Sequence, residues 1–326
     1  MLSVGRANLD LYSRDVGAAF EDITSFDAMV GGSPTNIAIG VARLGRSAAV
    51  LTAVGDDRTG DFVLRYLRDE GVDVRHVQRI PGKLTSLALL GVQPPDHFPL
   101  SFYREDPADI YITVEDVDAV PMPTVRSVQV SGNALSRGPC ANAARHALRT
   151  AKEHGIVTYM DLDLRPTEWE RPQDFGAAIL DAATDVDVVI GTEDEFAAAL
   201  LDDPGPIMET RRVPDGADAA LAGAIGDLLS AGPQVIIVKR GSDGASIVDT
   251  NGVEDVRGFP VTVVNTVGAG DAFAAGLIRS RLEGFDWSDS VRFANACGAI
   301  VVTRHGCSAA FPTLSEVEFF MRMEQP

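Results

Sequence analysis

A tight turn of small residues stands beside a carboxylate near the end of the chain. The turn is Gly268-Ala269-Gly270, and Asp271 follows it where a helical pattern begins. The first turn of a helix leaves backbone N–H groups without partners and carries the positive end of the helix dipole, so it attracts anions. A carboxylate there would repel a bound phosphate unless it takes part in proton transfer. These residues therefore indicate an anion-binding turn with Asp271 as a general base.

The same residues also have a purely structural explanation. Asp is a favoured N-cap of helices, and glycine-rich turns between strands and helices are common in α/β proteins. The turn alone supports both interpretations equally, so the rest of the chain must decide between them.

The segments around the turn predict how it is positioned. The β-branched run at 261–264 predicts a strand, and residues 271–278 predict the start of a helix. A second glycine-then-helix unit lies near the N-terminus, where GGSPTN at 31–36 precedes an apolar run with helical spacing. Ser and Thr suit the cap of a helix and Pro its first turn, so this unit also predicts a helix start.

Strand and helix patterns alternate along most of the chain, which is typical of a parallel sheet covered by helices. We therefore expect an α/β fold with three α/β/α layers and a mostly parallel central sheet. Apolar runs predict strands over 1–4, 48–54, 127–131, 156–161, 186–190, 235–239 and 245–249. Amphipathic runs predict helices over 37–45, 59–71, 140–155, 175–183, 193–201, 218–229, 289–303 and 315–323, with a surface loop over 202–217.

Two segments depart from this alternation. Residues 11–30 lack a helical pattern, and residues 84–105 predict two strands around a turn at 94–97. We expect both segments to form a small β-sheet lid on a single domain over 1–326. Because the open edges and apolar faces of such a lid often pair between subunits, we also expect a homodimer through the lid.

Polar or glycine features fall at the carboxyl ends of several predicted strands. The carboxyl ends of parallel strands share one edge of a sheet, where α/β proteins bind ligands. Each feature alone could be a cap, a turn or a solvated side chain. Their coincidence along one edge predicts a site made of Asp10, Gly31-Gly32 and residues 161–165, 192–195, 239–241 and 268–271.

Composition restricts the class of partner. The net charge is −19, from 28 basic and 47 acidic residues, which argues against nucleic acid and anionic membrane surfaces as partners. A small anionic substrate needs only a local basic pocket. Cys140, Cys297 and Cys307 show neither disulfide nor zinc-site spacing, and no signal peptide or long apolar segment is evident. We therefore expect a cytoplasmic protein.

The chain resembles the ribokinase-like (PfkB-type) sugar kinases. Two signatures carry the resemblance, GGSPTN at 31–36 and NTVGAGDAFAAG at 265–276. They lie about 230 residues apart in the family's order, which is far more specific than a lone glycine motif. The resemblance covers nearly the whole chain and implies a ribokinase-like fold and ATP-dependent phosphorylation of a sugar.

The resemblance also implies roles for individual residues. Asp271 would take the proton from a sugar hydroxyl, while the N–H groups of Ala269, Gly270 and Asp271, in the turn that Gly268 opens, hold the developing charge. Sugar hydroxyls would bond to Asp10, Gly32 and Asn36. Thr192 and Glu195 occupy the motif that organises Mg²⁺ and its waters, with Glu195 on the metal side. The nucleotide, ATP, would be lined by Thr192, Lys239, Gly241, Ala294, Asn295 and Gly298.

Two positions depart from the family pattern. Thr192 stands where Asn is usual, and Asn265 stands where Asp usually opens the second signature. That Asp often contributes to a monovalent-cation site beside the turn. An amide removes a charge there, which argues against activation by a monovalent cation.

Within the family, the chain is most similar to the branch that phosphorylates the sugar acid 5-dehydro-2-deoxy-D-gluconate in myo-inositol catabolism. The similar segments are residues 5–12, 94–105, 161–166 and 191–196. Fructokinases and 2-keto-3-deoxygluconate kinases share most of these sequence features, so they remain alternatives. A non-catalytic sugar or nucleotide sensor with the same fold is a further alternative. The presence of Asp271 favours an enzyme.

A sugar acid requires a cation for its carboxylate. Arg165 and Arg104 are the candidates, because a guanidinium offers paired donors to a carboxylate or phosphate. We expect Arg165 to make this contact after the predicted strand end at 161, with Arg104 reaching in from the lid. For Arg104, a structural ion pair with a neighbouring carboxylate is an equally good explanation.

Overall fold

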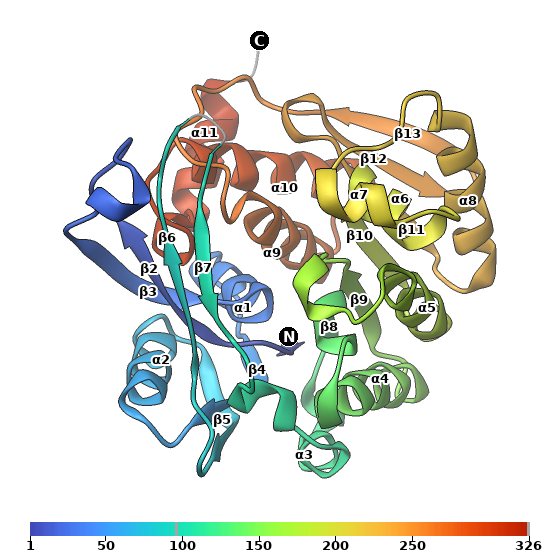
Figure 1. Cartoon of the computed structure of the whole chain (residues 1–326). Coiled ribbons are helices and arrows are strands. Elements are labelled where there is room, and N and C mark those ends of the chain that lie inside the picture. The colour runs from blue at the N-terminus through green and yellow to red at the C-terminus, as the bar shows by residue number, and fades with distance from the viewer. Residues whose placement is uncertain (95–96, 325–326) are drawn as a thin grey trace.

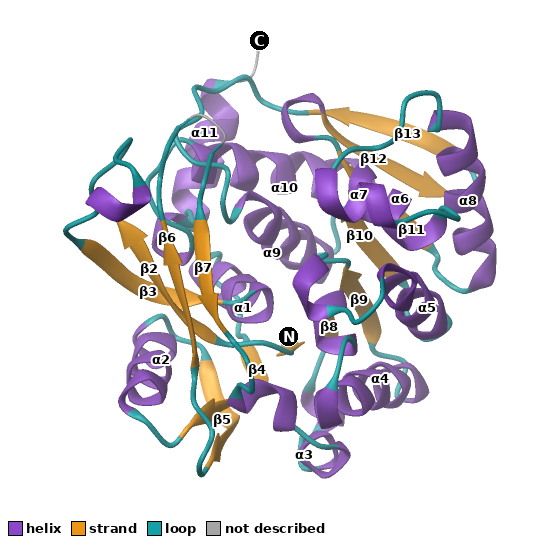
Figure 2. Cartoon of the chain, in the orientation of Figure 1, coloured by secondary structure: helices purple, strands orange, loops and turns teal. Residues whose placement is uncertain are grey.

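The computed structural model describes residues 1–94 and 97–324, and within them it contains a nine-stranded sheet and a separate four-stranded sheet. Helices cover both faces of the large sheet (Figure 1). Figure 2 shows the small sheet beside it, made of strands from the first third of the chain. The predicted three-layer α/β/α fold with a mostly parallel sheet and a small β-sheet is therefore confirmed.

The large sheet has the strand order β13-β12-β11-β10-β9-β8-β1-β4-β5. Neighbouring strands from β11 to β5 run parallel, whereas β12 and β13 extend the sheet in antiparallel fashion. The strands are β1 (Leu2–Val4), β4 (Ala49–Gly55), β5 (Asp73–Ile80), β8 (Ser127–Ser131), β9 (Val157–Asp161), β10 (Val188–Thr192), β11 (Val235–Lys239), β12 (Gly244–Asp249) and β13 (Gly252–Arg257).

The central strands are apolar at consecutive positions, and successive side chains of a strand point to opposite faces. Both faces of the large sheet are therefore apolar. In β10, Val189 packs with one group of helices, whereas Val188 and Ile190 pack with another. The first layer contains α3 (Val114–Asp118), α4 (Gly138–Glu153), α5 (Pro172–Ala183), α6 (Glu193–Leu200), α7 (Gly205–Thr210) and α8 (Asp218–Ala231). The second contains α1 (Ser33–Arg43), α2 (Arg58–Asp69), α9 (Ala269–Leu282) and α10 (Trp287–Val302), with α11 (Leu314–Met323) packed on α10. Within the described residues, no helix has the length and apolar character needed to cross a bilayer.

The small sheet, called the lid sheet below, has the order β3-β2-β6-β7. Its strands are β2 (Asn8–Ser13), β3 (Phe26–Gly31), β6 (Ser86–Leu90) and β7 (Leu100–Tyr103). Its residues Tyr12, Met29 and Leu90 belong to an apolar cluster that also includes residues of α10, α11 and the segment at 307–311. Of the predicted turn at 94–97, residues 95 and 96 lie outside the described residues. Asp10 lies inside the lid strand β2 rather than directly after β1, which corrects the sequence-based placement.

Three neighbouring strands of the large sheet end on residues predicted for the site. Asp161 ends β9, Thr192 ends β10 and Lys239 ends β11. Thr192 pairs with Lys239, and Asp161 pairs with Ile190 two residues before Thr192. These three side chains therefore lie along one edge, as the strand-end pattern predicts.

Several elements differ from the sequence-based prediction. The predicted strand at 261–264 is an extended loop, in which the Val264 N–H donates to the Val302 carbonyl at 2.7 Å instead of joining a sheet. Conversely, β5 and β13 were not predicted, and α7 lies in the predicted loop at 202–217. The two missed strands are at the edges of the large sheet, where β13 is mostly exposed and β5 is mostly half-buried, so they lack the apolar run that marks a buried strand.

Candidate active site

The first turn of α9 is shaped by a glycine in the left-handed region. Gly268 has φ 87° and is the N-cap of α9, and a Cβ there would lie 2.5 Å from the sulfur of Cys307. The Ala269 N–H donates to the Thr266 carbonyl at 3.3 Å. Among the described residues, the N–H groups of Gly270 and Asp271 have no acceptor. Two of the predicted backbone donors are therefore free for an anion.

Asp271 lies in this first turn, and a hydrogen bond from α1 fixes the position of its side chain. The amide nitrogen of Asn36 donates to its carboxylate at 2.8 Å, because α1 and α9 pack against each other (Figure 1). Burial raises the pKa of Asp271 and the nearby Asp163 carboxylate raises it further, although the Asn36 hydrogen bond opposes this. A carboxylate with a raised pKa is a stronger base, which suits proton removal from a hydroxyl.

Gly31 and Gly32, just before α1, allow the main chain to lie close to the Asp10 carboxylate. A Cβ on Gly31 would overlap the Asp10 carboxylate, and Gly32 has φ 99° with a Cβ position 2.5 Å from the Arg6 carbonyl. Asn36, one turn into α1, has a buried Oδ1 that finds no hydrogen-bond partner in the part of the chain that the structure describes. Burial raises the pKa of Asp10 to about 7, against the lowering effect of the Arg6 cation. Asp10 and Asn36 can thus offer acceptors to hydroxyl groups beside the glycine pair.

Lys239 supplies positive charge beside the first turn of α9. Its Nζ lies 3.0 Å from Asp161 Oδ2 and 3.9 Å from Glu195 Oε2. A Cβ on Gly270 would lie 3.3 Å from the same Nζ, so the ammonium group faces the turn. Burial would lower the pKa of Lys239, but the Asp161 and Glu195 carboxylates outweigh it and raise the pKa above its ordinary value. The group therefore stays cationic and favours an anion at the turn.

Glu195 is held as part of a capping box at the start of α6. Its Oε2 accepts from the Thr192 N–H at 2.9 Å, and its Oε1 accepts from the Leu164 N–H at 3.0 Å. Burial raises the pKa of Glu195, but Lys239 and these backbone donors outweigh that effect and lower it. The carboxylate is thus ionised and oriented.

The site offers no protein cage for a metal. Among residues 1–94 and 97–324, no three His, Cys, Asp or Glu side chains form a group that could hold one. Mg²⁺ bound with nucleotide phosphates needs only one or two carboxylates and keeps several waters. The ionised Glu195 at this edge fits such a water-mediated arrangement.

The residues predicted to contact the nucleotide differ in exposure and in what they contact. Gly241 is exposed just after β11, and a Cβ on Gly298 of α10 would meet only the Ala269 carbonyl, at 3.5 Å. Asn295 donates to the Val256 and Arg257 carbonyls at the end of β13. Ala294 is fully buried against α9, so it does not line an open site in this structure, because this side of α10 packs on its neighbour.

Arg165 and Arg104, the arginines predicted to contact the substrate, differ in exposure and in ion pairing. Arg165 contacts Asp163 at 2.8 Å and its side chain is 45% exposed. Arg104 is buried, with its Nη1 2.6 Å from Asp109 and its Nε 2.9 Å from Glu168. Of the two explanations offered for Arg104, the structure agrees with the structural ion pair, because these two carboxylates already engage its guanidinium group.

Two residues at the site had no role assigned to them from the sequence. Asp163, inside the predicted strand-end segment at 161–165, follows β9 with φ 37°, an unusual value for a residue other than glycine, and within the described residues its Oδ2 has no hydrogen-bond partner. Arg6 is 6% exposed, and the closest carboxylate oxygen among the described residues, on Asp163, is 3.9 Å away. Both belong to segments that carried the family resemblance, which was the available signal. The sequence could not indicate that an arginine at position 6 is buried.

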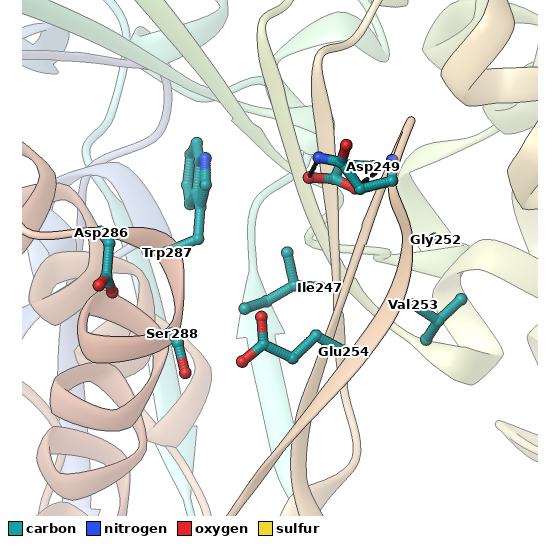
Figure 3. A pocket seen from close by; sticks show the side chains of 9 residues that line it. Ile247, Asp249, Gly252, Val253, Glu254, Asp286, Trp287 and Ser288 are labelled. Carbon is teal, nitrogen blue, oxygen red and sulfur yellow. Dashed lines mark hydrogen bonds between the residues drawn. The ribbon is translucent and has the colours of Figure 1, made fainter.

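A separate hollow lies far from these residues. Because β12 runs antiparallel to β11, its last residue, Asp249, is at the opposite edge from Lys239. The hollow contains none of the predicted site residues. Figure 3 shows its lining, which includes Ile247, Asp249, Gly252, Val253, Glu254, Asp286, Trp287 and Ser288.

Comparison with known proteins agrees with this geometry. A family model described as pfkB family carbohydrate kinase matches residues 1–314. A protein of Geobacillus thermodenitrificans named 5-dehydro-2-deoxygluconokinase is 34% identical, over 98% of this chain and 92% of its own length. Its namesake in Geobacillus kaustophilus is 33% identical over 99% and 94%.

Solved structures match over the same length. An E. coli protein described as ribokinase II, solved in complex with ATP and Mg²⁺, has a TM-score of 0.85 and 25% identity, and the match covers 99% of each chain. The chain therefore shares both the sequence family and the fold of proteins that bind ATP and Mg²⁺.

Proposed function

Because the chain belongs to the pfkB family of carbohydrate kinases, and is thus a sugar kinase using ATP and Mg²⁺, we propose that its acceptor is the primary hydroxyl of 5-dehydro-2-deoxy-D-gluconate. This sugar acid is the one that the relatives' name indicates, and its phosphorylation belongs to myo-inositol catabolism. The observation that carries the proposal is the pairing of Asp271 with Asn36 at the first turn of α9, next to a group of arginines.

The proposed chemistry is a direct phosphoryl transfer. Asp271 accepts the proton of the primary hydroxyl as that oxygen bonds to the γ-phosphorus of ATP. The bond from the γ-phosphorus to the bridging oxygen breaks, and ADP leaves. The free N–H groups of Gly270 and Asp271, with the Lys239 ammonium group, stabilise the charge on the transferring phosphoryl oxygens. The raised pKa of Asp271 supports its role as the base.

Mg²⁺ would neutralise charge on the nucleotide phosphates when bound. We assign its protein contact to Glu195, through water, because this carboxylate is ionised and fixed by two backbone N–H groups. Thr192, at the N-cap of α6, keeps that carboxylate in place. Lys239 and Gly241 are assigned to the phosphate side of the nucleotide, and Gly298 to the side that faces α9.

The sugar would lie between the lid sheet and the first turns of α1 and α9. Asp10 and the unpartnered Oδ1 of Asn36 would accept hydrogen bonds from its hydroxyls, with Gly32 allowing close approach of the main chain. Arg165 is assigned to the acidic end of the substrate or to the transferring phosphate, because its side chain is partly exposed beside Asp163.

ATP consumption measured against a panel of acidic and neutral sugars tests this proposal. We expect kcat/KM for 5-dehydro-2-deoxy-D-gluconate to exceed those for fructose and 2-keto-3-deoxygluconate by at least about 100-fold, the discrimination that a change of one group in a substrate pocket produces. A preference for fructose or for 2-keto-3-deoxygluconate would reassign the substrate. Binding of sugar or nucleotide without turnover would instead indicate a sensor.

We also propose a homodimer formed through the lid sheet. The large hydrophobic residues Leu84, Leu100 and Tyr103 are exposed by 71%, 52% and 64%, and β7, which carries Leu100 and Tyr103, is an edge strand of the lid sheet. Leu100→Glu with Tyr103→Glu should convert the dimer to a monomer in sedimentation equilibrium. The control Val253→Glu changes an exposed apolar residue of β13 and should leave the mass unchanged. A wild-type monomer contradicts the proposal.

We place the reaction in the cytoplasm, where ATP is available. All three cysteines, Cys140, Cys297 and Cys307, are free and buried, which is compatible with a reducing compartment. Fractionation of cells that express the tagged protein would test this location.

A further inference from the structure

Arg6 lies where the lid sheet meets the large sheet. It is in the short connection between β1 and β2, and its carbonyl borders Gly32. Its guanidinium carbon is 5.4 Å from the centre of the Phe102 ring in the lid strand β7. On the other side, Asp163 after β9 is its closest carboxylate. The side chain therefore reaches into the space between the two sheets, beside the glycine pair of the sugar side.

The charge of Arg6 is poorly compensated compared with the other buried cations of the site. Among residues 1–94 and 97–324, its buried Nε and Nη1 have no hydrogen-bond partner, and the closest ion-pair distance is 3.9 Å. Arg104, in contrast, has carboxylate oxygens at 2.6 and 2.9 Å, and Lys239 has one at 3.0 Å. A buried charge without hydrogen bonds is strongly unfavourable, so an anion bound next to Arg6 would stabilise its guanidinium group.

The carboxylates around Arg6 each have a closer donor. Asp163 contacts Arg165 at 2.8 Å, and Asp109 accepts from Arg104 at 2.6 Å. Asp10 accepts from the amide of Asn8. Burial lowers the pKa of Arg6 and Asp163 only partly opposes this, yet a guanidinium remains protonated. None of these neighbouring carboxylates supplies the missing direct partner.

We propose that Arg6 binds the carboxylate of the sugar acid and thereby sets the preference of the enzyme for acidic over neutral sugars. This inference rests on the proposed function and names the residue behind its substrate class. The two unpartnered nitrogens of Arg6 donate to the substrate carboxylate, while Asp10 and Asn36 hold hydroxyls nearby. Arg165, which is more exposed and paired with Asp163, then serves the transferring phosphate.

The test combines a change in the protein with a change in the substrate. Wild type and Arg6→Gln are assayed with 5-dehydro-2-deoxy-D-gluconate and with its carboxamide, which keeps the shape but lacks the charge. We expect Arg6→Gln to lower kcat/KM for the acid about 30- to 1,000-fold, mainly through KM, as loss of one partner of a buried charge pair does. For the carboxamide we expect a change below about threefold. The control Arg14→Gln removes an exposed lid arginine paired with Asp27 and should affect neither compound.

The outcomes separate this inference from the proposed function. Equal losses on acid and carboxamide would overturn the role of Arg6, because they indicate a contact with phosphate or a structural role, and would leave the sugar-acid kinase intact. A wild-type enzyme that uses the carboxamide as well as the acid would also overturn the role of Arg6, whereas only a preference for fructose or 2-keto-3-deoxygluconate would overturn the proposed substrate. A KM increase confined to ATP would also overturn the role of Arg6.

Stability of the ligand-free protein gives an independent readout. Because the Arg6 charge lacks a direct partner, Arg6→Gln should keep or raise the thermal midpoint, as replacement of a poorly compensated buried charge often does. A fall of more than about 8 °C would indicate a structural arginine and overturn the proposal. If Arg6→Gln does not fold, that outcome also counts against it. Arg6→Lys, which keeps the charge, should fold and lose about tenfold in acid over carboxamide preference.

Discussion

The amide nitrogen of Asn36 lies 2.8 Å from the carboxylate of Asp271, although the two residues are 235 positions apart. This contact joins the first turn of α1 to the first turn of α9. It makes the two glycine signatures of the chain one site, since each signature begins the helix that carries one partner. The carboxylate consequently has a fixed direction beside the free N–H groups of its own turn.

Removal of the base should affect turnover more than binding. Asp271→Asn keeps the size of the side chain and its place in α9, but it can no longer accept the hydroxyl proton. We expect kcat to fall about 10²- to 10⁴-fold, the usual contribution of general base catalysis, with KM for the sugar changed only a few-fold. Steady-state kinetics with saturating ATP would measure both. Ordinary turnover by Asp271→Asn would show that another group is the base.

The turn before α9 should not tolerate a side chain in place of Gly268. Gly268→Ala places a Cβ at φ 87° and 2.5 Å from the Cys307 sulfur, so the turn must shift. We expect a loss of about 1–3 kcal/mol in the free energy of unfolding and at least a tenfold lower kcat. Denaturant titration and kinetics would measure these changes.

Gly284→Ala is the matched control for that substitution. Gly284 follows α9 with φ 84°, but a Cβ there would meet no atom within 4 Å. We expect a loss of about 1 kcal/mol from backbone strain and an unchanged kcat. Equal effects of the two substitutions on kcat would contradict a specific role for the Gly268 turn.

Asp10 should make the stability of the ligand-free protein depend on pH. Burial raises its pKa from the ordinary 3.8 to about 7, so between these values the folded protein holds a proton that the unfolded chain releases. Stability therefore falls as pH rises from about 4 to about 7, by up to about 4 kcal/mol from this group. Asp10→Asn removes this contribution.

Urea titrations of wild type and Asp10→Asn at pH 5 and pH 8 would measure the effect. We expect the variant to gain stability relative to wild type at pH 8, and to gain less at pH 5, where wild-type Asp10 is still largely protonated. The same difference at both pH values would contradict the raised pKa of Asp10. Asp161, whose pKa burial also raises to about 7, contributes equally to both proteins and cancels.

Asn265 should make the enzyme independent of monovalent cations. Its side chain is fully buried, donates to the Gly306 carbonyl at 3.0 Å and accepts from the Val267 N–H at 3.0 Å. The amide thus stabilises this loop without a cation. We expect kcat in K⁺ and in Na⁺ to agree within about twofold, because no charged side chain at this position requires an ion.

Asn265→Asp is the informative variant for this prediction. It would place a carboxylate against the Gly306 carbonyl, and we expect its activity to be low without K⁺ and to rise when K⁺ is added. Strong stimulation of the wild-type enzyme by K⁺ would contradict the prediction.

Local patterns in the sequence determined much of the fold. Apolar runs gave the buried strands β8 to β11, because a strand covered on both faces needs apolar residues throughout. Glycine before capping residues predicted the start of α1, and the GAGD turn predicted the start of α9. The edge strands β5 and β13, which are not fully buried, escaped prediction, because their pairing depends on neighbours in space and not on their own hydrophobicity.

The sequence also identified most residues of the candidate site, because strand ends and helix starts are local features that parallel topology brings to one edge. Only the tertiary structure decided how the charges there are paired. Arg104 and Arg6 cannot be told apart from their residue type, yet Asp109 and Glu168 pair with Arg104, whereas no residue that the structure describes pairs closely with Arg6. Burial and ion pairing arise from segments far apart in the chain, such as β9 and the loop after β1. Such contacts exist only once the chain has folded.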